Sequence, residues 1–332
     1  MKLSIIGVVN TKITNISDYL KAIANQNNDD FELILIIQKV SDKLLNQLDN
    51  IPKELKDKTT IISNYKDLSM EYLMLCGLRI AKGEYISFVF PNSVIRPYTT
   101  QVFIDDINKY NTDIIEYKPR LIGDVRWKPS ARLDEKVTFD SSNPIYVALA
   151  FPFIFNKLFK NELVQKVLNI KEKLDNNSKF SIELLYYLLF NAKSYKYNDY
   201  RVLREIVDKD FVITPNTFKS VWEDLEKYLL LKEIRLNHEL KYARFYYSCI
   251  LTPGLLSGVT FWNLLGINTK SNRFSKLNLE KTDKFISKLF DNEFSNFGFK
   301  NKYMSLGLIE NELMKNKIPQ NEWKKILKVL HE

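Results

Sequence analysis

The sequence predicts an α/β protein: a Rossmann-like, mainly parallel sheet with helices on both faces, followed by a helical C-terminal region. Two observations lead to this prediction. In the first part of the chain, apolar runs of strand length alternate with segments of helical spacing, and strands that are apolar on both sides are typical of a parallel sheet covered by helices. From residue 216 on, the spacing is helical almost throughout.

The N-terminal elements follow the order strand, helix, strand, strand, helix, strand. Asn15 or Ser17 is the expected N-cap of the first helix, since Asn and Ser side chains accept hydrogen bonds from the free amides at a helix start. Gly83 ends the second helix, where Arg79 and Lys82 place positive charge near the negative end of the helix dipole. We predict strands at 3–9, 31–37, 61–64 and 85–90 and helices at 16–26 and 69–83.

The remaining elements change character along the chain. We predict a helix at 99–111, a strand at 113–117, an irregular segment at 117–145, helices at 153–170 and 178–192, and a short strand at 195–200. The later helices are expected at 218–247, 255–266, 280–291, 301–316 and 320–330. The composition shift near residue 215 predicts two domains, an α/β domain over 1–215 and a helical domain over 216–332.

The net charge of +9 is spread along the chain. Basic residues such as Lys324, Lys325 and Lys328 lie on amphipathic segments, which are typical of a solvated helix face; attraction to an anionic lipid surface is the alternative. No Gly-aromatic recognition motif is present, so we expect no nucleic-acid partner.

Residues 245–267 carry no charge and are long enough to cross a bilayer. Pro253 and Gly254, with Gly258 and Asn263, interrupt this stretch. We therefore predict two buried helical pieces with a turn at Pro253-Gly254, with a membrane-facing element as the alternative. We expect the protein to be cytoplasmic. Peripheral binding to the inner face of the membrane is compatible with this location.

Five stretches, taken in order, resemble the family 2 glycosyltransferases, which have the GT-A fold. LSIIGVVN (3–10) is similar to the first strand of that family, and YLKAIANQNNDDFELILI (19–36) to its first helix and second strand. GLRIAKGEYISFV (77–89) resembles the helix end and the strand that leads to the metal site. FNKLFKNELV (155–164) is similar to a Trp-Asn-Lys-Leu-Tyr-x-x-Glu-Leu segment, and FSIELLYYLLFNAK (180–193) stands where the family has its catalytic helix.

The resemblance implies a nucleotide-sugar donor and a divalent cation. In that family a cation held by carboxylates neutralises the diphosphate leaving group, and a later carboxylate takes the proton of the acceptor hydroxyl. Here the Asp-x-Asp-Asp metal motif falls on residues 90–93, Phe-Pro-Asn-Ser, and the Asp-Asp-Gly-Ser motif on residues 37–40, Ile-Gln-Lys-Val. The carboxylates of both motifs are missing, so we expect no metal ligand set, and a cation only if the degenerate site still binds one.

A short set of candidate site residues remains. Glu183 stands close to the catalytic Asp of the family and is the candidate general base; the alternative is an i, i+4 partner on a helix face. Lys39 and Arg96 are candidate cations for the diphosphate, and Gln38 a hydrogen-bonding partner of the base. The candidate donor-binding set is Val9, Asn10, Gln38, Lys39, Asn92 and Arg96.

The metal-binding and nucleotide-binding residues of the family are missing here, but residues that determine its scaffold are present. These are Gly83, Glu84, Tyr85, Asn156, Lys157 and Leu158. The first hypothesis is a glycosyltransferase that acts on a lipid, glycan or protein acceptor. The second is a catalytically inactive homologue that serves as a binding or scaffold subunit, with a protein partner at the helical C-terminal region. A non-enzymatic assembly role unrelated to sugars is a third, because fold does not fix function.

Overall fold

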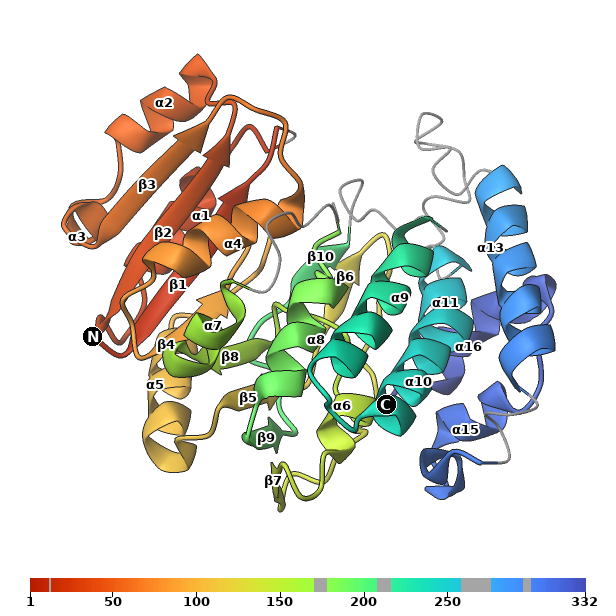
Figure 1. The fold of residues 1–332 in the computed structure, drawn as a ribbon. Coiled ribbons are helices and arrows are strands. Elements are labelled where there is room, and N and C mark those ends of the chain that lie inside the picture. Colours follow the sequence, from red (N-terminus) through yellow and green to blue (C-terminus); the bar gives the residue numbers. More distant parts are fainter. Residues whose placement is uncertain (12, 170–177, 208–215, 258–275, 295–299) are drawn as a thin grey trace. The chain divides into compact units, whose positions relative to one another are not determined.

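A computed structural model describes residues 1–332 except 12, 170–177, 208–215, 258–275 and 295–299 (Figure 1). The chain forms two compact units. Unit 1 comprises Met1–Pro119, Glu135–Ser141 and Phe153–Ile206, and unit 2 comprises Arg120–Asp134, Ser142–Pro152 and Val207–Glu332.

Unit 1 is built on a central sheet. Its strands are β1 (Leu3–Val9), β2 (Phe31–Gln38), β3 (Thr59–Asn64), β4 (Tyr85–Phe88), β5 (Ile114–Tyr117), β7 (Thr138–Asp140), β8 (Lys157–Lys160) and β9 (Ser194–Asn198). Within the described residues they form one eight-stranded sheet in the order β3-β2-β1-β4-β8-β5-β9-β7. The pairs β1–β2, β1–β4, β2–β3 and β5–β9 are parallel, and β8 runs antiparallel to both β4 and β5. The predicted mainly parallel sheet is confirmed.

Helices cover both faces of this sheet. Gly77 of α4 (Met70–Ile80) lies against Ile6, whereas Tyr19 of α1 (Ser17–Ala24) lies against Gly7. Neighbouring strand residues point to opposite faces, so α4 and α1 pack on opposite sides of β1; Figure 1 shows α4 crossing β1 and β2. The N-cap position of α1 is Ile16, not Asn15 or Ser17 as predicted, although Asn15 Oδ1 does accept from the Ser17 amide (3.0 Å) at the start of the helix.

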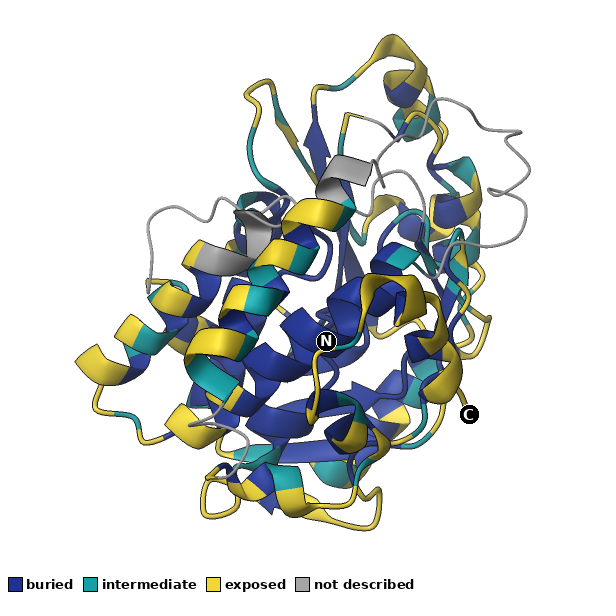
Figure 2. Cartoon of the chain, turned by 90° about the vertical axis from the view of Figure 1, so that its right-hand side faces the viewer, coloured by how far each residue is buried: buried dark blue, intermediate teal, exposed yellow. Residues whose placement is uncertain are grey.

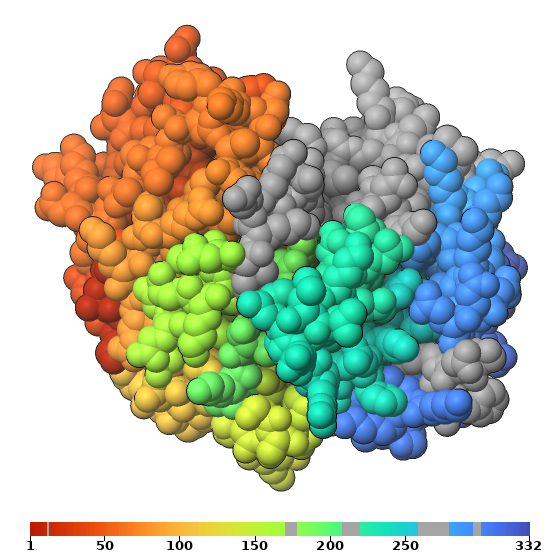
Figure 3. All heavy atoms as spheres, in the orientation of Figure 1, coloured from red at the N-terminus to blue at the C-terminus, as the bar shows by residue number. Residues whose placement is uncertain are grey.

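The other helices of unit 1 differ in burial. α8 (Ile182–Asn191) is almost wholly buried, whereas α2 (Asp42–Asp49) and α3 (Lys53–Lys56) expose most of their residues. Figure 2 shows buried residues along the strands and exposed residues on outer helix turns, and the atoms around α2 and α3 lie at the surface in Figure 3. The remaining helices are α5 (Thr99–Tyr110) and α7 (Asn161–Val167).

Unit 2 is mostly helical, as predicted for the C-terminal region. Its described elements are β6 (Leu121–Gly123), α6 (Ile145–Leu149), α9 (Asn216–Leu231), α10 (Asn237–Phe245), the π-helix η1 (Tyr246–Leu251), α11 (Thr252–Ser257), α13 (Lys276–Leu289), the π-helix η3 (Phe290–Phe294), the 3₁₀ helices η4 (Lys302–Ser305) and η5 (Gln320–Glu322), α15 (Ile309–Met314) and α16 (Trp323–Val329). The short strand β10 (Glu205–Val207) contains the unit boundary. None of the helices within the described ranges is long and apolar enough to span a bilayer.

Several predicted elements are corrected. The predicted helix at 153–170 is wrong in its first part: Lys157–Lys160 form β8, which pairs with both β4 and β5, and the helix α7 begins at Asn161. The segment 117–145 holds the short elements β6 and β7, each of three residues and too short to leave a pattern. The predicted helix at 218–247 is interrupted between α9 and α10, where Glu233 has a positive φ of 54°.

The predicted turn at Pro253-Gly254 is also wrong. η1 leads directly into α11 across these residues. The Thr252 amide donates to the carbonyl of Tyr247, five residues back, so the widened helix continues. Pro253 lies in the first turn of α11, where a missing amide costs least. Residues 258–267 of this uncharged stretch lie outside the described residues.

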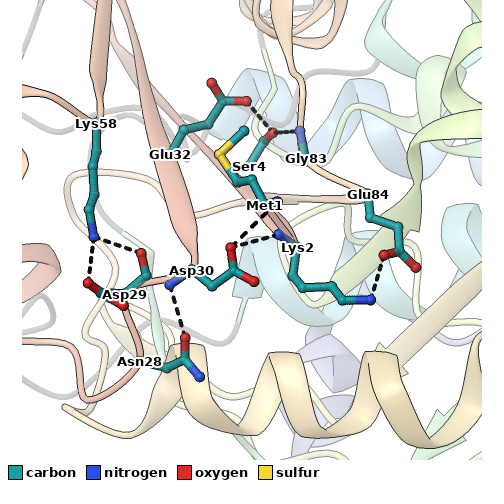
Figure 4. A network of polar contacts seen from close by, with 10 residues as sticks. All are labelled: Met1, Lys2, Ser4, Asn28, Asp29, Asp30, Glu32, Lys58, Gly83 and Glu84. Carbon is teal, nitrogen blue, oxygen red and sulfur yellow. Dashed lines mark hydrogen bonds and ion pairs between the residues drawn. The ribbon is translucent and has the colours of Figure 1, made fainter.

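The Gly-Glu-Tyr motif anchors β4 to the start of β1. The Gly83 amide donates to Ser4 Oγ (2.8 Å), which donates to Glu32 Oε1 (2.6 Å), and Lys2 Nζ pairs with Glu84 at 2.7 Å (Figure 4). A Cβ at residue 83 would lie 2.5 Å from the Ser4 backbone nitrogen. Only glycine fits this close approach, so the motif is a scaffold feature.

A buried polar network joins β8 to its neighbours. Lys157 Nζ donates to Glu116 Oε1 (2.7 Å), to Asn156 Oδ1 (2.9 Å) and to the Phe153 carbonyl (2.8 Å). Tyr195 Oη donates to Glu116 Oε2 (2.6 Å). The Lys157 and Glu116 side chains are both 0% exposed. The network satisfies both charges where water cannot.

Gly83→Ala should lower the free energy of unfolding by about 1–3 kcal/mol, because the added Cβ meets rigid backbone. Urea denaturation measures this change. Lys82→Ala, at the exposed neighbouring residue, is the matched control and should leave stability nearly unchanged. Equal stability of the two variants would contradict the close approach.

Lys157→Met should cost about 3–5 kcal/mol of unfolding free energy, because it leaves Glu116 charged and buried without its cation. Adding Glu116→Gln should recover part of this loss. Lys58→Met, which breaks the surface pair of Lys58 with Asp29, should have little effect. If thermal and urea unfolding show the Lys157 and Lys58 variants to be equally stable, the buried pair is not the constraint inferred here.

Candidate functional site

The ends of β1, β2 and β4 lie side by side in unit 1, at the edge where parallel α/β sheets bind ligands. Val9, the last residue of β1, is 0% exposed and pairs with Ile37 of β2. Asn10 follows it and is half-buried; its carbonyl accepts from the Ile13 amide (3.1 Å). The structure thus brings Val9 and Asn10 together with the end of β2, where Gln38 lies.

Gln38 and Lys39 hold the loop between β3 and α4. Gln38 Nε2 donates to the carbonyls of Lys66 (3.3 Å) and Leu68 (3.1 Å), and its side chain is buried. Lys39 has a positive φ of 54°, and its Nζ lies 2.5 Å from Asp67 Oδ1. Both candidates therefore lie at the edge of the sheet where β2 ends, and the side chain of each contacts this loop.

The loop after β4 contains both Asn92 and Arg96, but only Asn92 lies near the end of β4. Asn92 is half-buried in a turn in which the Ser93 amide donates to the Phe90 carbonyl (2.8 Å). The Arg96 side chain is exposed, and its carbonyl accepts from Gln26 Nε2 (2.9 Å). Gln26 precedes β2, and Gln38 ends it. The structure therefore does not bring Arg96 to the strand ends with Gln38.

A buried ion pair lies against the residues aligned with the metal motif. Lys179 Nζ is 5.4 Å from the centre of the Phe90 ring and 3.1 Å from Glu205 Oε1. Ser93 Oγ donates to Glu205 Oε2. The Lys179 and Glu205 side chains are 1% and 0% exposed. A buried ammonium thus stands beside the position at which the family resemblance implies a cation.

Sequence reasoning missed both members of this pair. Neither lies in a motif of the resemblance, and the segment that carries Glu205 reaches the β4 loop through an antiparallel bridge between Val94 and Arg204. Such a contact between distant segments leaves no sequence pattern. The available signal was Lys179 itself, a lone charge directly before a long apolar helix.

Glu183 lies in the first turn of α8 and is 3% exposed. Its Oε1 accepts from Tyr187 Oη at 2.9 Å, one helical turn on. Glu183 is therefore an i, i+4 partner of Tyr187, which was the alternative to the role of general base. Its burial keeps the carboxylate out of bulk solvent.

Glu71, in the first turn of α4, is a second buried carboxyl beside Glu183. Its Oε1 accepts from Ser181 Oγ (2.9 Å) and from the Leu184 amide (3.5 Å). Burial, followed by the nearby charge of Glu183, raises the pKa of Glu71 to about 8. Glu71 was not predicted, although a carboxylate in the apolar run SMEYLMLCGL signals a special environment.

The described residues contain no group of three or more His, Cys, Asp and Glu side chains arranged to hold a metal ion. The groups gathered in unit 1 are instead a buried ammonium at the β4 loop, two carboxyls at the start of α8, and amide and hydroxyl groups at the strand ends. These groups can neutralise, accept a proton from, or hydrogen-bond to a polar ligand.

Comparison with known proteins gives a family profile match and a set of structures with the same fold. Residues 4–168 match the profile of the family described as glycosyl transferase family 2. The crystal structure of S. aureus TarS 1–349 in complex with UDP-GlcNAc is similar, with a TM-score of 0.61 and 15% identity over 99% of this chain and 91% of that chain. The UDP complex of the same TarS fragment has a TM-score of 0.60 and 16% identity over 99% and 90%.

The chain is also similar to the structure titled S. aureus TarS, with a TM-score of 0.59 and 15% identity, and covers 55% of that chain. At these identities the likeness establishes the shared fold, which confirms the predicted fold class. No curated protein sequence matches the chain.

Substitutions at the β4 loop test whether the ammonium excludes a cation. Phe90→Asp with Asn92→Asp should bind Mn²⁺ weakly, because the new carboxylate at position 90 pairs with Lys179. Adding Lys179→Ala should give stronger binding, since the ammonium beside position 90 is then gone and the two new carboxylates can act as the oxygen ligands that hard cations need. Calorimetry compares these variants with the wild type and with Lys179→Ala alone. Tight Mn²⁺ binding by the wild type would disprove the interpretation.

Proposed function

Because the chain belongs to glycosyltransferase family 2 through residues 4–168, we propose that it transfers a sugar from a nucleotide sugar to an acceptor hydroxyl without a divalent cation at the β4 loop. The observation that carries this proposal is the Lys179–Glu205 pair against Phe90. A positive charge stands next to the cation's position, and it belongs to the chain itself.

Lys179 supplies charge to the diphosphate by exchanging partners. Its flexible four-carbon stem lets the ammonium turn from Glu205 toward a phosphate oxygen. Glu205 keeps a hydrogen-bond donor during this exchange, because Ser93 Oγ donates to its other oxygen. The developing negative charge on the leaving diphosphate then meets a positive charge of the protein in a site with little water, where such stabilisation is strong.

Glu183 is the proposed general base. The acceptor oxygen attacks the anomeric carbon, and the bond from that carbon to the phosphate oxygen breaks with its electron pair on the diphosphate. Glu183 takes the hydroxyl proton. Val9, Asn10 and Gln38 are the proposed neighbours of the base and ribose, Lys39 lies beside them, and Asn92 offers a neutral oxygen at the β4 loop.

UDP-GlcNAc, which the TarS fragment binds in its crystal structure, is the first donor to test. The acceptor classes are a lipid, a glycan and a protein hydroxyl. Peripheral membrane contact remains a separate prediction, tested by vesicle sedimentation.

A second candidate function is a binding or scaffold subunit without transfer activity. The observation that favours it is the engagement of the candidate donor groups within the protein: Gln38 with two loop carbonyls, Lys39 with Asp67 and Lys179 with Glu205. In that case these internal bonds persist and no donor displaces them.

Calorimetric titration with UDP-GlcNAc and with UDP distinguishes the two candidates. We expect binding in EDTA that Mn²⁺ strengthens by less than about threefold, and a loss of about tenfold or more in Lys179→Met, because a charge-assisted contact contributes on the order of 1.5–3 kcal/mol. Lys53→Met, at an exposed lysine of α3, is the matched control. Binding only with Mn²⁺ would refute the metal-free proposal, and no binding of either probe would favour the scaffold.

A further inference from the structure

The Glu71 carboxyl joins α4 to the start of α8. Its Oε1 accepts from Ser181 Oγ, and the amides of Glu183 and Leu184, in the first turn of α8, also donate to the carboxyl. Ser181 itself, in the left-handed region at φ 50°, provides no side-chain cap. Glu71 therefore supplies the cap of this buried helix from another element.

The second oxygen of Glu71 has no such partners. Glu71 is 0% exposed, and its Oε2 is buried without a hydrogen-bond partner. If Glu71 were ionised, a charged oxygen would lie in apolar surroundings with no donor, which is the costly form of a buried carboxylate. A proton on Oε2 removes that charge and leaves the cap contacts of Oε1 intact.

Glu183 meets different conditions. It retains 3% exposure, and its Oε1 accepts the Tyr187 hydroxyl hydrogen. Glu183 thus has a hydrogen-bond donor at its carboxyl, whereas Glu71 Oε2 has none. Neighbouring like charges disfavour each other, so a proton on Glu71 removes the repulsion between the two carboxyls.

We propose that Glu71 and Glu183 form a carboxyl pair that holds one proton at neutral pH, with the proton on Glu71 and the negative charge on Glu183. Glu71 is then a positioning residue: it caps the helix that carries Glu183 and removes the like charge that would oppose Glu183 as a base. The catalytic consequence rests on the proposed function, whereas the location of the proton does not.

The groups that face Glu71 support this assignment. The titratable group from α8 is Glu183, and its negative charge raises the pKa of Glu71 in addition to the effect of burial; the Ser181 hydroxyl and the two amides lower it less. Lys179, two residues before Ser181, is paired with Glu205. The net result is a pKa raised from the ordinary value of 4.5 to about 8.

The sign of the pH dependence follows from this shift. Between pH 4.5 and about 8 the folded state holds a proton on Glu71 that the unfolded state has released. Stability therefore falls as the pH rises through this range and levels off above it. One such proton changes the folding equilibrium constant by up to about tenfold per pH unit.

The test measures urea unfolding from pH 5 to 9 for the wild type, Glu71→Gln, Glu183→Gln and the double variant. Gln resembles a protonated acid, so Glu71→Gln should lose this pH-dependent component. Glu183→Gln should shift the upper end of this pH range toward lower pH, because the negative charge that raises the pKa of Glu71 is gone. Glu84→Gln, at the half-exposed glutamate paired with Lys2, is the matched control and should follow the wild-type profile.

Infrared difference spectroscopy of the wild type gives a second measurement that needs no stable variant. A protonated carboxylic acid band should be present at pH 6 and lost as the pH rises past about 8. Absence of this band at pH 6, or an unchanged pH profile in Glu71→Gln, would overturn the proposal.

A turnover assay with UDP-GlcNAc separates this inference from the proposed function. If transfer occurs, Glu183→Gln should lower turnover by at least about 10²-fold, as for a lost general base, while Glu71→Gln at pH 7 should stay within about threefold of the wild type. A hundredfold loss in well-folded Glu71→Gln would overturn the positioning role. Absence of transfer in the wild type would count against the proposed function with this donor and not against the carboxyl pair, which the stability and infrared results decide.

Discussion

The buried ion pair between Lys157 and Glu116 is the interaction on which the architecture of unit 1 depends. It lies where the antiparallel strand β8 separates β4 from β5. A buried pair is stable only when its remaining hydrogen-bonding capacity is met, and here Asn156, Tyr195 and the Phe153 carbonyl meet it. The network fixes β8, and β8 places β4 and its loop beside the edge where β1 and β2 end.

This same pair explains why part of the fold escaped prediction. The parallel strands and their helices were predictable, because continuous apolar runs such as LSIIGVV and FELILII have one stable arrangement, burial on both faces. β8 was not, because Lys157 reads as a solvated residue in any local pattern and becomes a core residue only through Glu116, 41 positions away. The strands β6 and β7 could not be predicted, because three residues are too few to show a pattern of alternating polarity.

The candidate site divides in the same way. The strand ends near Val9, Asn10 and Gln38 were predictable, because parallel strands end at a common edge and the family resemblance fixed their register. The contacts of Lys179 with Glu205 and of Glu71 with Ser181 were not, since each joins segments with no sequence relation. Both pairs of segments lie within unit 1.

The Lys179–Glu205 pair also bears on how substitutions at this site combine. A carboxylate introduced alone at position 90 would meet an ammonium already present, and loss of Lys179 alone would remove the ammonium that pairs with the buried Glu205. Each single step toward a cation site thus passes through a form that is less stable or gains no ligand. The pair therefore couples residues 90, 179 and 205, so the effect of a substitution at one of them depends on which residues occupy the other two.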